Sequence, residues 1–246
     1  MESNKRAMMT LLALVMTALF IFGMEKKFLF IEKRGSALSH YEDKITWADK
    51  ILLLIDDFEG LTKVDSLKKE SFFTFGSTRI SVDTIQIDGN AISSKSSMKV
   101  EWDSTINYGG WGKGLGINIE LDPNTDYLNF RAYVPASNGN DEKIKIVLQE
   151  DDLNDGLYDV NTDDEWNYIA DIKAKDQWQI ISIPLKNFLD ANKGGDGILN
   201  ITRKGGLHNI AFAFNQPEKY TKHHKWYFDF VCFSKGVITQ QDIDNN

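Results

Sequence analysis

The stretch LNFRAYVPASNGNDEKIKIVLQ, residues 128–149, decides the fold class because it contains two runs of alternating residues around a turn. In each run every second side chain is apolar, a period that is typical of β-strands with one face against a core. Between the runs stand Pro135 and the triplet Asn138-Gly139-Asn140, which favour a reversal of the chain. This stretch therefore predicts two β-strands that are joined by a turn.

Similar strands and turns continue on both sides of this stretch. Turns rich in glycine, asparagine and aspartate separate seven further candidate strands: 79–87, 98–102, 115–121, 166–172, 178–185, 207–214 and 225–233. Short strands with such turns, and no long helix between them, predict an all-β sandwich. One domain over residues 51–236 has the size of a jelly roll, and residues 237–246 are interpreted as a polar tail.

The bulk composition excludes some classes of protein. Of the 246 residues, 42% are hydrophobic and 12% aromatic, which is enough to form a packed core. The net charge of −8 argues against nucleic acid as a partner, because phosphates need a basic surface. The single cysteine, Cys232, lies in an apolar strand and is predicted to be a buried, inert thiol.

The N-terminus is predicted to direct the domain out of the cytoplasm. Lys5 and Arg6 precede an uncharged segment, residues 7–24, which as a hydrophobic helix would span about 27 Å, close to the hydrocarbon core of about 30 Å. Residues 1–24 are interpreted as a signal peptide or a membrane anchor, with a buried helix as a third alternative. Residues 25–50 are interpreted as a linker with an amphipathic helix, whose apolar spacing runs on to Leu52.

No sequence motif indicates catalysis. None of the four histidines stands in a triad or metal-binding pattern. The glycines of GWGKGLG, residues 110–116, lead into a strand, whereas a phosphate-binding loop leads into a helix. The 36 acidic residues are too many for any one carboxylate pair to indicate glycoside cleavage. The chain is therefore predicted not to be an enzyme.

Carboxylates gather at places that suit calcium, a cation that prefers oxygen ligands. The loop 151–165 is interpreted either as a solvated acidic loop or as an irregular calcium or ligand loop, because it departs from the EF-hand pattern. Asp57 and Glu59 are two residues apart, so an extended strand would place them on one face. Asp229 lies between two phenylalanines and needs a partner, which a metal between the first and last strands would provide.

Five segments, in order, resemble family 11 carbohydrate-binding modules and related galactose-binding-like jelly rolls, among them the complex I intermediate-associated protein family. These segments are IDDFEG (55–60), SSMKVEW (96–102), GGWGKGLGINI (109–119), DQWQIISIPLKNF (176–188) and WYFDFVCF (226–233). The resemblance extends over about residues 51–236. It implies a jelly roll with a structural calcium ion that joins the first strand to the last, with Asp57, Glu59 and Asp229 as the metal ligands.

The resemblance also implies a domain that binds a polysaccharide or an oligosaccharide. Aromatic rings that stack on sugars and acidic groups that bind hydroxyls are the expected ligand-binding residues: Tyr108, Trp111, Asp164, Glu165, Trp166 and Tyr168. The sequence departs from the family at LDANKGGDG, residues 189–197, which lacks the expected arginine and tyrosine. It departs again at Asn215-Gln216, where an aromatic residue would suit a sugar platform.

Two functions are consistent with these features. The first is a non-catalytic carbohydrate-binding domain with a structural calcium site, located outside the cytoplasm as a secreted, periplasmic or cell-surface protein. The second is a structural or assembly protein that uses the jelly roll to contact protein partners in an envelope complex or extracellular filament, since one fold serves many functions. The order of the five segments favours the first function, and the departures at the binding positions favour the second.

Overall fold

The computed structural model describes residues 49–59, 71–88, 95–103, 109–138, 142–199, 206–214 and 223–244. These residues belong to one compact unit, Asp49–Asn246. The hydrophobic helix expected at residues 7–24, and the amphipathic helix up to residue 48, lie outside the described residues. Within the described part of the chain, no helix has the length and apolar character needed to cross a membrane.

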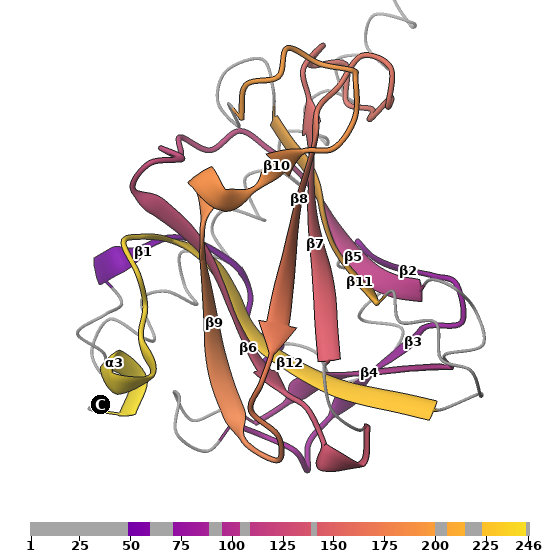
Figure 1. Ribbon diagram of the computed structural model, residues 1–246, viewed down its shortest axis with the longest axis vertical. Helices are drawn as coiled ribbons and strands as arrows, with labels where there is room; N and C mark the ends of the chain where they lie inside the picture. The colour runs from indigo at the N-terminus through magenta and orange to yellow at the C-terminus, as the bar shows by residue number, and fades with distance from the viewer. Residues whose placement is uncertain are drawn as a thin grey trace, which may run out of the picture. The chain divides into compact units, whose positions relative to one another are not determined.

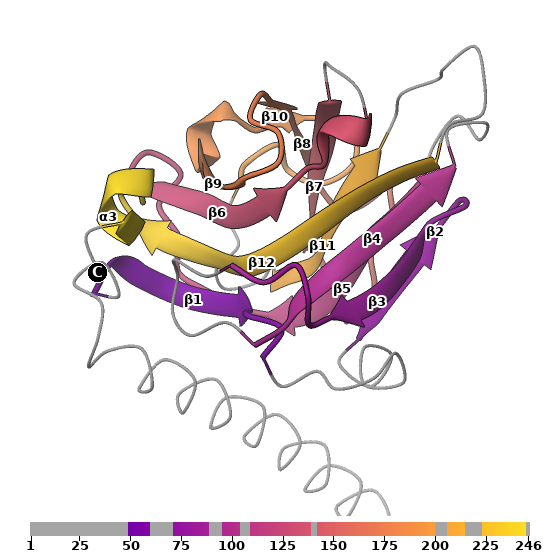
Figure 2. The ribbon, with the colours of Figure 1, turned by 90° about the horizontal axis from the view of Figure 1, so that it is seen from below.

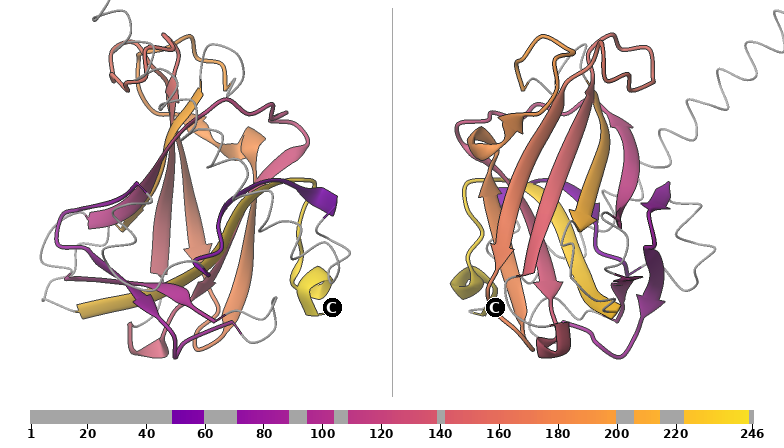
Figure 3. Two further views of the ribbon diagram at one scale, coloured as in Figure 1. Left: turned by 180° about the vertical axis from the view of Figure 1, so that it is seen from behind. Right: turned by 45° about the vertical axis from the view of Figure 1, so that its right-hand side comes forward.

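The described strands form two antiparallel sheets of six strands each, which pack as a sandwich (Figures 1 and 3). The first sheet has the order β3–β4–β12–β6–β9, with β1 also paired to β12, and the second has the order β10–β8–β7–β11–β5–β2. The strands of the first sheet are β1 (Ile51–Asp56), β3 (Arg79–Asp83), β4 (Ser97–Asp103), β6 (Asp126–Tyr133), β9 (Trp178–Pro184) and β12 (His223–Lys235). Those of the second are β2 (Phe72–Phe75), β5 (Gly109–Ile117), β7 (Glu142–Asp151), β8 (Glu165–Ile172), β10 (Leu189–Asp190) and β11 (Gly206–Phe214).

The core between the sheets consists of the side chains that alternate along these strands. On β7, Ile144, Ile146 and Leu148 are all fully buried, as the period of two predicts. Aromatic rings fill the centre, where Phe212 of β11 meets Phe228 of β12 with 5.5 Å between ring centroids. Such contacts add about 0.5–1.5 kcal/mol to the burial of the rings themselves. The predicted all-β sandwich is therefore confirmed.

The first and last strands are neighbours, as the resemblance implied. β1 runs antiparallel to the C-terminal half of β12, with Ile51 opposite Ser234 and Asp56 opposite Val231 (Figure 2). The N-terminal half of β12 pairs with β4, and its other edge pairs with β6. Near the middle of β12 the register shifts, and Phe230 takes a positive φ of 46°. The last strand is therefore the centre of the first sheet.

Several predicted boundaries are wrong. Ile51 and Leu52 belong to β1 and not to a helix, because pairing with β12 outweighs their helical spacing. The strand expected at 115–121 lies earlier, at Gly109–Ile117, and includes most of the glycine-rich motif. The strand expected at 79–87 ends at Asp83, whose carboxylate accepts hydrogen bonds from the next turn. β2 was not predicted, because four residues are too few to show a period.

The C-terminal residues are packed against the domain, so the polar tail expected at 237–246 is shorter than predicted. Ile238 and Ile243 are both buried, and the short helix α3 covers Gln240–Asp244. Thr239 caps this helix, since its backbone N–H and hydroxyl donate to Oδ2 of Asp242 at 2.7 and 2.8 Å. In return, the backbone N–H of Asp242 donates to Oγ1 of Thr239 at 3.1 Å.

Candidate functional site

The carboxylate of Asp56 joins the two sheets across the core. Its Oδ2 forms an ion pair with Lys113 of β5, whose side chain is buried because it points inward between the sheets. The Lys113 ammonium also donates to the carbonyl of Ile55 at 3.3 Å and lies 4.6 Å from the centre of the Phe72 ring. The other oxygen of Asp56 accepts the backbone N–H of Phe58 at 2.8 Å. The first acidic residue of IDDFEG thus has a structural partner.

The carboxylates predicted to bind metal do not meet at one point. β1 ends at Asp56, and Phe58 takes a φ of 57°, so Asp57 and Glu59 lie in a turn and do not share one face of a strand. Oδ1 of Asp57 accepts the N–H of Glu59 at 3.2 Å. The carboxylate of Glu59 accepts backbone N–H groups of Lys95 at 2.8 Å and Ser96 at 3.3 Å. These hydrogen bonds fasten the turn to the loop before β4.

Asp229 is buried in β12, where its Oδ1 accepts the N–H of Phe230 at 2.7 Å. The residue opposite it on β6 is Arg131, a buried cation that forms an ion pair with Asp88 and that the sequence alone did not place nearby. Among the described residues, only one group of three metal-ligating side chains has its ligand atoms within 4.8 Å of one another, and Asp229 is not in it. A single site formed by all three predicted ligands is therefore not seen.

Two of the tryptophans predicted to stack on sugar lie inside the sandwich. Trp111 is 1% exposed and stacks on Phe212 with 4.5 Å between ring centroids. Trp166 is 8% exposed and belongs to the same core. Tyr168, two residues further along β8, also points inward and contacts Phe188. The prediction is wrong for both tryptophans, because these buried rings have no face left for a ligand.

Of the two acidic residues that precede Trp166, Glu165 lies on the outer side of the sheet and Asp164 is buried. Glu165 points to the outer face of the second sheet, because neighbours along a strand face opposite ways. Asp164 lies just before β8 and is buried, with Oδ2 accepting the N–H groups of Asp196 and Gly197 at 3.2 and 2.9 Å. Tyr108 lies outside the described residues. Of the six predicted ligand residues, Glu165 alone is found on an outer sheet face within the described chain.

Two phenylalanines that the sequence reading missed lie on that outer face. Phe73 of β2 is opposite Gly112 of β5, and Phe75 is opposite Gly110. A Cβ added to either glycine would come within 2.4 Å of the phenylalanine ring opposite, so the rings lie directly over the glycine backbone. Phe73 remains 38% exposed, and the two ring centroids are 6.5 Å apart. The alternate glycines of GGWGKG were the available signal, since large rings often cover strand glycines.

Beyond the phenylalanines, a strip of small residues leads to a row of hydrogen-bonding side chains. Ala211 and Ala213 of β11 lie next to Gly112 and Gly110 in register. On the far side, Gln149 accepts from Asn209 at 3.0 Å and donates to Glu165 at 3.1 Å. Further hydrogen bonds reach the same carboxylate from Asn167 and from Tyr158. We call this surface the outer face; it is formed by Phe73, Phe75, Gly110, Gly112, Ala211, Ala213, Gln149, Asn209, Glu165, Asn167 and Tyr158.

The hydrogen-bonding side chains of the outer face include both donor and acceptor groups. Burial, and then the charge of Glu165, raise the pKa of Tyr158, so its hydroxyl stays protonated at neutral pH. Lys145 lies 3.9 Å from Glu165 at the same row and supplies a positive charge. Amides, a carboxylate, a phenol and an ammonium group can together bind the hydroxyl groups of a sugar. The nearby rings supply apolar faces.

The other sheet also has a row of aromatic side chains, of which Tyr133 and Trp178 are partly exposed and Tyr227 is buried. Trp178, Tyr133 and Tyr227 lie in one cross-strand row on β9, β6 and β12. The ring centroids of Tyr133 are 5.9 Å from Trp178 and 5.8 Å from Tyr227. These rings are inclined to one another by 56° and 79°, so they do not form a flat platform. The two phenylalanine rings on the outer face, by contrast, are inclined by only 34°.

The match to a family model assigns this sandwich to a class of protein, the β-sandwich carbohydrate-binding modules. Within this class, the chain belongs to the family described as the surface glycan-binding protein B xyloglucan-binding domain, whose model matches residues 49–245. The matched range begins at the start of the described unit and includes α3. No curated protein matches the chain.

Solved structures that are similar to the chain include a family 11 carbohydrate-binding module from Clostridium thermocellum in complex with a β-1,3-1,4-mixed-linked tetrasaccharide. It is 18% identical, with 78% of this chain and 97% of that chain covered and a TM-score of 0.49. A structure of an exo-β-agarase is 12% identical, with 78% of this chain and 26% of that chain covered and a TM-score of 0.51. At this identity the second likeness concerns the fold alone.

Proposed function

We propose that the chain binds a xyloglucan-type polysaccharide on its outer face without cleaving it. The observation that supports this most is the family match, which spans the whole sandwich. Phe73 and Phe75 would stack on successive sugar rings, while Gln149, Glu165 and Asn167 bind hydroxyl groups. The binding would be shallow, because the middle of the face consists of glycine and alanine.

The location and the metal content belong to the same proposal. A polysaccharide ligand is met outside the cytoplasm, which agrees with the signal peptide or membrane anchor expected at residues 1–24. A structural calcium ion at the turn of Asp57 and Glu59 would stabilise the contact between that turn and the loop at Lys95. Calcium at this turn would need backbone or water oxygens in addition to these carboxylates.

Affinity electrophoresis and titration calorimetry with xyloglucan test the proposal. We expect Phe73→Ala to weaken binding about tenfold, because one sugar–aromatic contact is worth about 1 kcal/mol. Glu165→Gln should weaken it by a similar factor, because one acceptor oxygen and the charge are lost. Ile85→Ala is the control, since Ile85 is 89% exposed and lies in the turn after β3.

Two other results would reject the outer face as the binding site. If Trp178→Ala abolishes binding and Phe73→Ala does not, the polysaccharide lies on the aromatic row of the first sheet. If neither xyloglucan nor any other glycan binds, the alternative of a protein-interaction surface is favoured. That alternative has its own support, because Leu153 and Leu157 between β7 and β8, and Leu189 of β10, are exposed.

A further inference from the structure

Leu189 is an exposed apolar residue on the strand at one edge of the second sheet. It lies on β10 opposite Asn167 of β8, so both side chains point to the outer face. Leu189 is 71% exposed. Phe73, which is 38% exposed, lies on β2 at the opposite edge of the same sheet. Each edge of the outer face therefore carries an exposed apolar side chain.

The strand register places Leu189 and Phe73 in one row that crosses all six strands of the sheet. The middle of this row is low, because Val147 is buried and Ala211 and Gly112 are small. Five spacings of about 4.8 Å between neighbouring strands separate the two ends, roughly 24 Å in all. We call these residues the Leu189–Phe73 row: Leu189, Asn167, Val147, Ala211, Gly112 and Phe73.

A line of hydrogen-bonding side chains runs beside the Leu189–Phe73 row and in the same direction. Glu165, Gln149 and Asn209 lie opposite one another on β8, β7 and β11, two residues along each strand from the row. Hydrogen bonds of 3.1 and 3.0 Å join them. A sugar chain that lies across the strands would meet these groups along much of its length, whereas a chain parallel to the strands would meet them at one end only. The outer face therefore favours a ligand that crosses the strands.

The ion pair of Lys145 with Glu165 lies across the middle of this path. Lys145 is on the other side of the row from Glu165, and its ammonium group lies 3.9 Å from the carboxylate. Both side chains are partly exposed, at 36% and 22%. The pair offers a donor and an acceptor to sugar hydroxyl groups at the centre of the path. The exposed apolar contacts are found at the two ends of the row.

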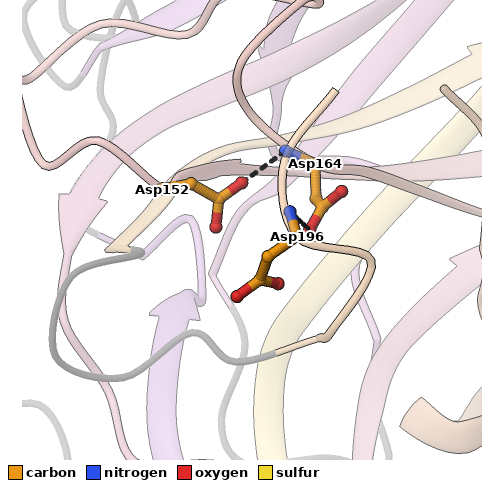
Figure 4. Close-up of side chains that lie close together, drawn as sticks. All are labelled: Asp152, Asp164 and Asp196. Atoms are coloured by element: carbon orange, nitrogen blue, oxygen red, sulfur yellow. Dashed lines mark hydrogen bonds between the residues drawn. The ribbon is translucent and has the colours of Figure 1, made fainter. Parts of the chain in front are cut away.

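Hydrogen bonds around β10 fix the backbone at Leu189. In the loop that follows, the side-chain oxygen of Asn192 accepts the N–H of Glu165 at 2.8 Å. Further along the same loop, the N–H of Asp196 donates to Oδ2 of Asp164 at 3.2 Å (Figure 4). The edge strand is thus held against β8, which lowers the entropy cost of ordering this segment when a ligand binds.

We propose that the polysaccharide crosses the strands along the Leu189–Phe73 row and that Leu189 contacts the end of the bound stretch opposite to Phe73. This inference rests on the proposed binding of a polysaccharide to the outer face. The length of the row, roughly 24 Å, corresponds to a main chain of about five sugar rings. Leu189 would therefore favour long oligosaccharides over short ones, because a ligand that does not reach from Phe73 to β10 lacks this contact.

Titration calorimetry of the full 246-residue chain tests the proposal with xyloglucan oligosaccharides whose main chains have four or eight glucose units. We expect Leu189→Ala to weaken binding of the eight-unit oligosaccharide about fivefold, because apolar contact area is lost, and to leave binding of the four-unit oligosaccharide unchanged. Phe73→Ala should weaken the binding of both. Leu153→Ala is the matched control, since Leu153 is 61% exposed and lies between β7 and β8, outside the row.

The Leu189→Ala variant should keep its fold, because the side chain is exposed, and its melting temperature should stay within about 3 °C of the unaltered chain. Two outcomes would overturn the proposal. If Phe73→Ala weakens binding of the eight-unit oligosaccharide and Leu189→Ala does not, the ligand does not reach β10, and the proposed function still holds. If the unaltered chain binds neither oligosaccharide nor xyloglucan itself, the proposed function fails as well.

Discussion

At the scale of single residues, the buried pair of Asp56 and Lys113 determines how the two sheets are joined. Lys113 follows Gly112 on β5, and the alternation of the strand sends its side chain inward, where an unpaired ammonium group would be costly. Asp56 at the end of β1 provides the opposite charge. The pair thus depends on an exact register in two strands that belong to different sheets.

We predict that Lys113→Met destabilises the domain by about 2–3 kcal/mol, because Asp56 is left mostly buried without its cation. Urea unfolding at pH 7 measures this change. Lys143→Met is the control, since the ion pair of Lys143 with Asp171 is more than half exposed and worth less than about 0.5 kcal/mol. Equal losses in the two variants would contradict a special role for the buried pair.

Residue types alone did not reveal which aromatic side chains are exposed. Glu165 and Trp166 are adjacent, so a strand must send them to opposite sides, and only the sheet topology shows which side is the core. The sequence alone also did not show which side of the sheet Trp111 faces, because its neighbours in the strand are glycines. Phe73 was overlooked because FFTF contains no polar residue apart from a threonine.

At the scale of elements, the glycines of β5 make the outer face possible. Gly112 lies under the ring of Phe73, and a Cβ there would come within 2.4 Å of that ring and 2.7 Å of the carbonyl of Ile210. Gly114 faces the same way two residues later, but its nearest neighbours would be 3.6 Å away. β5 therefore tolerates a side chain at position 114 but not at position 112.

We predict that Gly112→Ala displaces the Phe73 ring, lowers stability by about 1–3 kcal/mol and weakens polysaccharide binding. Gly114→Ala is the matched control and should change the unfolding free energy by less than about 1 kcal/mol. Thermal unfolding and calorimetry of both variants make the comparison. If Gly112→Ala binds xyloglucan as tightly as the unaltered chain, Phe73 does not contribute to binding.

The cap of α3 should depend on pH. Hydrogen bonds from Thr239 lower the pKa of Asp242, so this carboxylate stabilises the fold above its ordinary pKa near 3.8. That contribution is lost as the pH falls through the lowered pKa. We predict that Asp242→Asn costs up to about 1 kcal/mol at pH 7 and that the difference from the unaltered chain shrinks as the pH falls below 3.8. A difference that does not shrink as the pH is lowered would show that charge is not the cause.

At the scale of the whole molecule, the alternating strands were readable from the sequence because half-buried strands need a period of two. The bounds of β4, β6, β8, β9, β11 and β12 agree with the predicted ranges within a few residues. Where the structure differs, tertiary packing outweighs local pattern: Ile51 and Leu52 join a strand despite their helical spacing. The segment after β12 is packed although most of its residues are polar, because Ile238 and Ile243 are buried.

We predict that a chain ending at Gly236 still folds but loses about 3 kcal/mol, since two buried isoleucines are removed. Urea unfolding of the shortened chain measures the loss. An unchanged midpoint would mean that residues 237–246 behave as a free polar tail. Complete loss of cooperative unfolding would mean that α3 is essential to the sandwich.

The central position of β12 has a consequence for how the protein is made. Its partners β1, β4 and β6 are all synthesised earlier, and β1 precedes it by most of the length of the domain. While the chain grows on the ribosome, the first sheet lacks the strand that joins its two halves. Long-range pairing of this kind is slow, and it begins only after β12 has been synthesised. Until β12 has emerged from the ribosome, the nascent chain therefore cannot close its first sheet.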